Sequence, residues 1–312
     1  MRIILTRALE IQIIFRVAII HAAILSLIGI VIPFLFFHTG FRNLWKEKET
    51  KSKTYAWVTS FFFLVLPVLV DLVFIPGAWL QLLVRAAYVA FMAWLFFKVD
   101  HPLKHLALFF LIWVPLEINL FSQCFIQFNE KSKTHTDIFH AIALLIFFYR
   151  LRRPLPDSIF KIKITLREFG QVWLAVMGLA VAIIPIALAV GFIEFNPKSV
   201  DHPLDVVELS LKILAYLIAV AIPEELLFRV QLFHSLEEAS LMLKLVASSL
   251  LFAMAHILNE TANHPPPNWW YFLFSGVAGV AYGYMYIRTG RMFVAALLHA
   301  MVDGIWLHFF RI

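Results

Sequence analysis

The chain has 312 residues, of which 62% are hydrophobic and only 15% are charged. Soluble domains are about half apolar and a quarter charged, so this composition excludes an ordinary soluble domain and favours a membrane protein. The formal net charge is +6, but Lys and Arg occupy short gaps between apolar runs, where they set membrane topology and do not indicate nucleic-acid binding. The single cysteine, Cys124, excludes an internal disulfide framework and a cysteine-based zinc site.

Apolar runs long enough to cross a membrane follow one another along the chain. A spanning helix needs about 20 mostly apolar residues. Two shorter runs, 138–149 and 244–258, are predicted as a tilted or re-entrant piece and as a short helix shielded by its neighbours. We therefore predict an all-α fold, a polytopic membrane helix bundle with about 8–10 transmembrane helices. The longer predicted spans are 17–37, 55–75, 79–97, 103–125, 172–192, 206–230, 269–287 and 292–310.

The basic residues predict both a boundary and an orientation. The polar stretch 150–171 is the best boundary, dividing N-terminal helices of unassigned role (1–171, with this stretch as a linker) from a second transmembrane domain (172–312). If the helices after residue 171 alternate in direction, nine cations lie on one side and only Lys198 and Arg311 on the other. Basic loops stay in the cytoplasm, so we expect the first side to be cytoplasmic in the cell membrane. These nine are Arg150, Arg152, Arg153, Lys161, Lys163, Arg167, Lys244, Arg288 and Arg291.

Polar residues interrupt the apolar runs of the C-terminal third. They occur in the segments AIPEELLFRV, LFAMAHILN and LLHAMVDGIW. A charge at mid-bilayer costs roughly 2.5–3.5 kcal/mol on insertion scales, so such residues are functional candidates. With a turn between the helices of Glu224 and His256, both side chains lie about 18–20 Å from the same side of the membrane. His299 lies about 12 Å from that side, so the three can meet in one site.

The acidic pair predicts a division of roles. Glu225 and Arg229 are four residues apart and can pair along one helix face. Glu224 points about 100° away and is left to face a cavity. Pro223 cannot donate its backbone hydrogen bond, so it should loosen the helix beside the carboxylate.

This set of side chains permits activation of water. A carboxylate with a histidine can remove a proton from water, and a second histidine with a further polar group can stabilise an oxyanion. Peptide hydrolysis needs both functions. The hypothesis therefore places Glu224 and His256 at the water, with His299 nearby.

Three motifs carry a resemblance to a known family. They are Glu224-Glu225-x-x-x-Arg229, Phe252-x-x-x-His256 and His299-x-x-x-Asp303, in this order on hydrophobic helices. The pattern resembles the CPBP family, which includes type II CAAX prenyl endopeptidases and bacteriocin-processing or self-immunity proteins. The resemblance covers roughly 206–310, and nothing familiar matches 1–170.

The resemblance implies a glutamate-dependent intramembrane endopeptidase that needs no cofactor or metal. It implies that Glu224 and His256 activate the water, and that His299 and Asp303 form the oxyanion site. Glu225, Arg229 and Phe252 would support the structure or the substrate. The implied partners are the lipid bilayer and a membrane-anchored protein or peptide, cleaved in a CAAX-type or other C-terminal processing reaction.

Two departures and two alternatives remain open. Many members carry Asn where this chain has Asp303, and a glycine often follows the motif arginine where this chain has Val230. An ionised Asp only accepts hydrogen bonds, so Asp303 must be protonated or must orient His299. One alternative is a zinc protease, with His256, His299 and a carboxylate as ligands, although a His-Glu-x-x-His helix is lacking. The other is a non-catalytic immunity or sorting protein.

Overall fold

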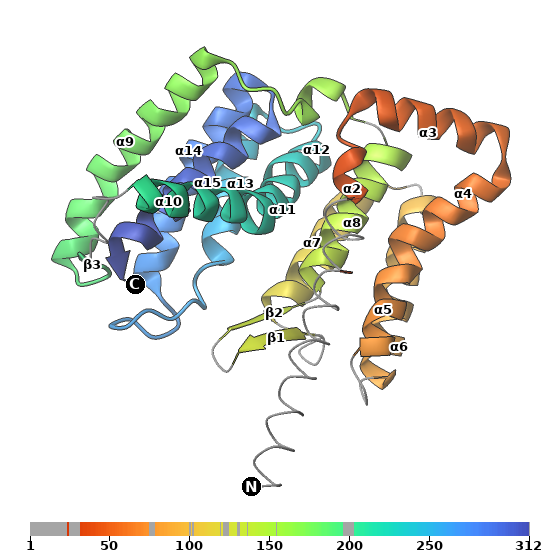
Figure 1. Cartoon of the computed structure of the whole chain (residues 1–312), viewed down its shortest axis with the longest axis horizontal. Helices are drawn as coiled ribbons and strands as arrows, with labels where there is room; N and C mark the ends of the chain where they lie inside the picture. The colour runs from red at the N-terminus through yellow and green to blue at the C-terminus, as the bar shows by residue number, and fades with distance from the viewer. Residues whose placement is uncertain are drawn as a thin grey trace, which may run out of the picture. The chain divides into compact units, whose positions relative to one another are not determined.

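The computed structural model describes residues 32–74, 79–99, 103–118, 125–129, 132–135, 137–153, 155–195 and 203–311, together with Ile24, His101 and Leu120. Most of the predicted span 17–37, and Cys124, lie outside the described residues. The chain divides into two compact units, Met1–Leu155 and Pro156–Ile312 (Figure 1). The second unit thus begins inside the basic stretch at 150–171, and the division of roles between 1–171 and 172–312 stays a prediction.

Unit 1 is mostly helical, with one small hairpin. Its packing is rich in aromatic side chains, such as Phe96 stacked on Phe148 with ring centroids 4.5 Å apart. The fully buried Arg150 donates to the backbone oxygens of Phe36 (2.7 Å) and Phe37 (3.1 Å), which compensates for removing its charge from water. The elements are α2 (Ile32–Leu35), α3 (Thr39–Lys51), α4 (Lys53–Ser60), η2 (Phe61–Val65), α5 (Leu66–Phe74), α6 (Trp79–Lys98), α7 (Lys104–Glu117), β1 (Phe125–Asn129), β2 (Ser132–His135), α8 (Asp137–Ile146) and η3 (Phe147–Arg152).

The predicted span 103–125 is wrong in its second half. The helix α7 ends at Glu117, and residue 125 begins the strand β1, which pairs antiparallel with β2. Asn119, Ser122 and Gln123 follow α7 in the sequence and break its apolar run. Alternation in the segment FIQFN then suits a strand better than a helix.

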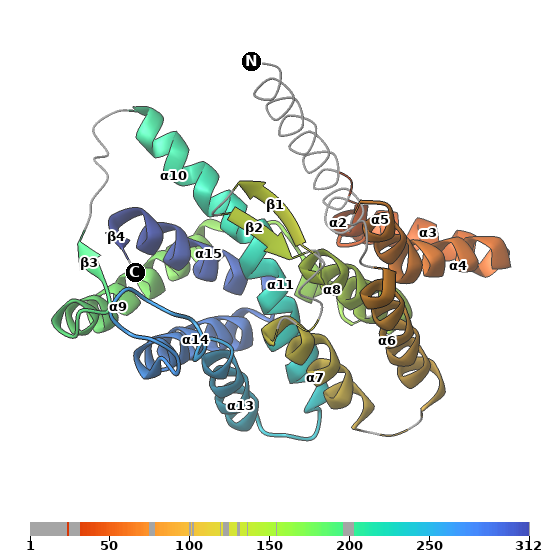
Figure 2. The same cartoon turned by 90° about the horizontal axis from the view of Figure 1, so that it is seen from below.

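Unit 2 is a helical bundle that contains all three motifs. Figures 1 and 2 show α13 lying along α14, and α15 between α9 and α10. A two-residue strand near the C-terminus, β4, pairs antiparallel with β3 after α9. The elements are η4 (Asp157–Phe160), α9 (Leu166–Ala189), β3 (Glu194–Phe195), α10 (Pro203–Tyr216), η5 (Leu217–Ala221), α11 (Ile222–Glu225), η6 (Leu226–Gln231), α12 (Leu232–Ser235), α13 (Leu241–Met254), α14 (Trp269–Thr289), α15 (Met292–Phe309) and β4 (Phe310–Arg311).

The helix ends of unit 2 follow the sequence. Thr165 and Glu168 form a capping box at the start of α9, and Asn268 caps α14 by accepting from the Tyr271 N–H. The helix α14 stops at Gly290, whose φ of 64° is the left-handed conformation that glycine adopts most easily. Along α14, Gly279 and Gly283 are four residues apart and both face α13, where small residues allow close helix contact.

The all-α prediction is confirmed, and the chain is a multi-pass membrane protein. Among the described residues, four helices are long and apolar enough to cross a membrane: Lys53–Val70, Leu166–Ala189, Asp205–Ser235 and Met292–Phe309. The third is longer than the predicted span 206–230 because it runs without a break through η5, α11, η6 and α12. The helix α13 is shorter than the predicted 244–258 at its far end, since it stops at Met254.

Candidate active site

A cavity of about 300 Å³ lies inside unit 2. Its lining includes Glu224, His256, His299 and Asp303, together with Phe252, so it contains a residue from each of the three motifs. Apolar side chains such as Ile183, Phe274 and Leu307 complete the wall. Residues far apart in the sequence are therefore brought to one space, as the motif spacing predicts.

The long helix through Pro223 presents the two carboxylates differently. It winds as a π-helix before the acidic pair, in η5, and again after it, in η6. Pro223 therefore lies between two π-helical segments, and π winding recurs at functional sites. The side chain of Glu225 is fully buried, whereas that of Glu224 is 30% exposed and lines the cavity.

A buried ion pair holds Glu225 away from the cavity. Arg229 Nη1 lies 3.1 Å from Glu225 Oε1, and both side chains are fully buried. Arg229 Nη2 donates to the backbone oxygen of Gly279 at 3.0 Å, and its guanidinium lies 4.6 Å from the centre of the Phe252 ring. The predicted pairing of Glu225 with Arg229 is confirmed, and a backbone contact and an aromatic face support the buried cation.

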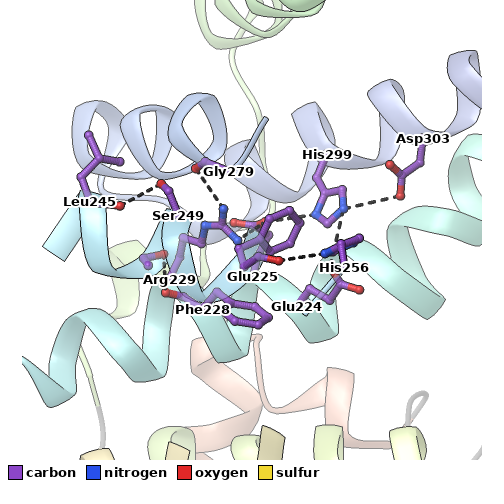
Figure 3. A network of polar contacts seen from close by, with 12 residues as sticks. Glu224, Glu225, Phe228, Arg229, Leu245, Ser249, His256, Gly279, His299 and Asp303 are labelled. Carbon is purple, nitrogen blue, oxygen red and sulfur yellow. Dashed lines mark hydrogen bonds and ion pairs between the residues drawn. The ribbon is translucent and has the colours of Figure 1, made fainter. Parts of the chain in front are cut away.

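His299, on α15, lies among three carboxylates (Figure 3). Its Nδ1 is 3.1 Å from Oε1 of Glu225. Its Nε2 is 3.7 Å from Oε2 of Glu224 and 3.5 Å from Oδ2 of Asp303. A carboxylate accepts, so Nδ1 donates to Glu225 and this contact fixes the orientation of the ring.

His256 lies just beyond the end of α13, not within a helix as the predicted span 244–258 placed it. Its Nδ1 is 2.8 Å from the backbone oxygen of Phe252, one turn earlier. A carbonyl oxygen can only accept, so Nδ1 carries the proton in this contact. In a neutral ring, Nε2 is then the nitrogen that can accept a proton.

The motif segment also matches a family of known proteins. Residues 206–305 match the family model described as Type II CAAX prenyl endopeptidase Rce1-like. This segment is therefore similar to that family over the matched residues. The CPBP resemblance drawn from the three motifs is therefore confirmed, and it identifies a CAAX-type intramembrane protease in general terms. No curated protein and no solved structure matches the chain.

The structure adds two contacts to this CAAX-type site that the motifs alone did not predict. The ring of Tyr282 stacks on His299 with centroids 4.5 Å apart and an interplanar angle of 19°. Glu225 touches His299 as well as Arg229, so one oxygen joins two motifs. Tyr282 lies three residues after Gly279, so both residues share the face of α14 that approaches the other helices. This spacing could have predicted that Tyr282 lies near the site.

A zinc site fits these side chains poorly. In the ranges that the structure describes, no three His, Cys, Asp or Glu side chains are grouped as a metal-binding set. We therefore derive no step through a metal.

Proposed function

We propose that the chain is a glutamate-dependent intramembrane endopeptidase, in which Glu224 and His256 activate the water that cleaves a peptide bond. The observation that carries the proposal is the environment of the Glu224 carboxylate. Its Oε2 is buried, accepts no hydrogen bond from the described residues, and belongs to a side chain lining the same cavity as His256. A carboxylate oxygen of this kind can take a proton from water.

The first step is attack of the water oxygen on the carbonyl carbon of the substrate. The proton leaving the water passes to Glu224, assisted by Nε2 of His256, which is available while Nδ1 donates to Phe252. The same proton is then delivered to the amide nitrogen as the C–N bond breaks. The products are a carboxylic acid and an amine, and the enzyme returns to its starting protonation state.

His299 and Asp303 stabilise the tetrahedral oxyanion in this proposal. With Nδ1 held by Glu225, a doubly protonated His299 presents Nε2–H towards the cavity. Asp303 lies 3.5 Å from that nitrogen, so it orients the ring or, when protonated, donates to the oxyanion itself. Glu225 and Arg229 position these groups without contacting the substrate.

The substrate is a membrane-anchored protein or peptide. The match to CAAX prenyl endopeptidases supports C-terminal processing, with a prenylated peptide as the first substrate to test. The excess of basic residues on one side supports a cell-membrane location with the site reached from the cytoplasm. This orientation also gives access to newly made proteins.

The test is mass spectrometry of membrane and secreted peptides from cells with wild-type protein or with Glu224→Gln. Removing a general base lowers the rate by about 10²–10⁴-fold, so the substrate should accumulate uncleaved in the variant. The matched control is Glu208→Gln on the same long helix, whose carboxylate is half exposed and pairs with Lys212. Normal cleavage by Glu224→Gln would reject the glutamate mechanism.

The same cells distinguish an enzyme from a non-catalytic immunity or sorting protein. A double variant of Glu224 and His256 should lose any phenotype that depends on cleavage. Complementation that survives loss of both side chains would instead support the non-catalytic hypothesis.

A further inference from the structure

A second cavity, of about 470 Å³, lies at the start of α9. It shares no lining residue with the cavity that contains Glu224. In Figure 1 the beginning of α9 and the end of α14 lie at the same end of unit 2. We call this cavity the basic pocket, and its lining residues are Lys161, Thr165, Arg167, Glu168, Gln171, Arg288, Thr289 and Arg291.

The basic pocket has an excess of positive charge. Four of its lining residues are Lys or Arg and one is an acid, Glu168, which pairs with Arg291. The side chains of Lys161, Arg167 and Arg288 are exposed and make no ion pair with a carboxylate in the part of the chain that the structure describes. Three cations are therefore available to one ligand.

A buried arginine builds the wall of the basic pocket. The side chain of Arg291 is only 9% exposed, and its Nη1 pairs with Glu168. Its Nη2 donates to the backbone oxygen of Lys161 at 2.8 Å and to that of Lys163. Its Nε is buried and donates to no described residue, so the wall retains an unsatisfied donor.

The backbone adds to this attraction for anions. The pocket lies at the N-terminus of α9, a helix of 24 residues whose first turn forms part of the lining. The N-terminal end of a helix carries partial positive charge and exposed N–H groups, which favour an anion. The N-terminus of α9, the exposed cations and the buried Nε of Arg291 thus all favour binding of an anion in the basic pocket.

The position of the pocket along α9 indicates where its ligand comes from. The candidate span Leu166–Ala189 begins at the pocket, so a bilayer crossed by α9 would place the pocket near the lipid headgroups. Apolar side chains follow directly along α9 and face outwards: Leu166 is 91% exposed and Leu174 is 74% exposed. Trp173, 41% exposed, is of the type enriched at membrane interfaces. The cations of the basic pocket can bind an anionic headgroup, and the exposed apolar surface along α9 can contact the acyl chains of the same lipid.

We propose that the basic pocket binds the phosphate of an anionic membrane phospholipid, with its acyl chains lying along the first turns of α9. Lys161, Arg167 and Arg288 contact the phosphate and the remainder of the headgroup. Arg291 holds the wall in place. The bound lipid would tie the segment before α9 to the turn between α14 and α15, from which the helix of His299 begins.

The experiment is native mass spectrometry of the purified full-length protein in detergent, after incubation with phosphatidylglycerol, phosphatidylcholine or inorganic phosphate. The wild type should retain phosphatidylglycerol in preference to phosphatidylcholine. The triple variant Lys161→Gln, Arg167→Gln, Arg288→Gln should lower that preference by about tenfold or more, because each cation near the headgroup contributes to binding an anionic lipid. These side chains are exposed, so the variant should keep the wild-type melting temperature.

The matched control removes three charges elsewhere, in the variant Lys48→Gln, Lys51→Gln, Lys53→Gln around the start of α4. It should keep the preference of the wild type. The proposal is overturned if the control loses as much preference as the pocket variant, or if the pocket variant loses none. It is also overturned if inorganic phosphate alone occupies the site and phosphatidylglycerol is not retained, since the ligand is then a soluble phosphate. None of these outcomes tests the proposed peptide cleavage by Glu224.

Discussion

Glu225 Oε1 lies 3.1 Å from Nδ1 of His299 and 3.1 Å from Nη1 of Arg229, so one buried oxygen joins the first and last motif helices. Both His299 and Arg229 are buried, so water cannot take the place of either contact with this oxygen. The adjacent Glu224 instead lines the cavity. Two consecutive carboxylates thus have different surroundings, and they should respond differently to substitution.

The first prediction compares these two carboxylates. Glu225→Gln leaves the buried guanidinium of Arg229 without its counter-charge, which should cost about 3–5 kcal/mol of stability. Glu224→Gln should leave the melting temperature close to that of the wild type while abolishing cleavage. Thermal unfolding in detergent, combined with a cleavage assay, measures both effects. Equal melting temperatures for the two variants would contradict the structural role assigned to Glu225.

The second prediction concerns Asp303. Asp303→Asn supplies an amide that can donate a hydrogen bond to an oxyanion, so it should keep activity within about tenfold of the wild type. Asp303→Ala removes the group altogether and should lower the rate by about 10²–10³-fold, the usual loss for one oxyanion donor. The measurement is the cleavage rate at saturating substrate. If the Asn variant is as inactive as the Ala variant, the ionised carboxylate itself is required.

The third prediction concerns metals. Cleavage by the purified protein should be unchanged after incubation with a strong zinc chelator, and elemental analysis should find far less than one zinc per chain. The physical reason is that, among the described residues, no three His, Cys, Asp or Glu side chains are grouped so that they could hold a metal ion. Loss of activity on chelation that zinc restores would favour the metalloprotease alternative.

The fourth prediction concerns the contact between α13 and α14. A Cβ at Gly279 would lie 3.2 Å from the Phe252 ring and 3.3 Å from the backbone Cα of Ser249. Gly279→Ala should therefore push the helices apart and cost about 1–3 kcal/mol, seen as a lower melting temperature. The control is Gly178→Ala on α9, where an added Cβ meets nothing within 4 Å. A similar loss for both variants would show that the effect does not arise from helix contact.

Much of the site could be predicted because its chemistry is unusual for a membrane. Glu224, His256 and His299 stand out as polar residues in apolar runs, and the i,i+4 spacing of Glu225 and Arg229 is enough to predict their pair. The contact of Glu225 with His299 could not be predicted, since it depends on how α15 is rotated against α11. The stacking of Tyr282 on His299 depends on the same packing.

The errors in the fold have a different cause. Hydropathy measures the length of an apolar run and not the point at which a helix stops, so the predicted span 103–125 passed the end of α7 at Glu117. For the same reason the helix α13 was extended past Met254, and His256 was placed on a helix that it follows. In both places apolar residues continue among polar ones beyond the helix end, so the hydropathy averaged over the run does not mark the boundary.

The π-helical winding around Pro223 has a consequence for the direction of the acidic pair. Each π turn holds one residue more than an α turn, so the helix rotates less per residue through η5 and η6. Regular α winding through these segments would carry the carboxylate of Glu224 to another azimuth around the helix axis. The direction of the Glu224 carboxylate is therefore set by local unwinding of the helix, and a one-residue deletion in η5 would redirect it without removing a polar side chain.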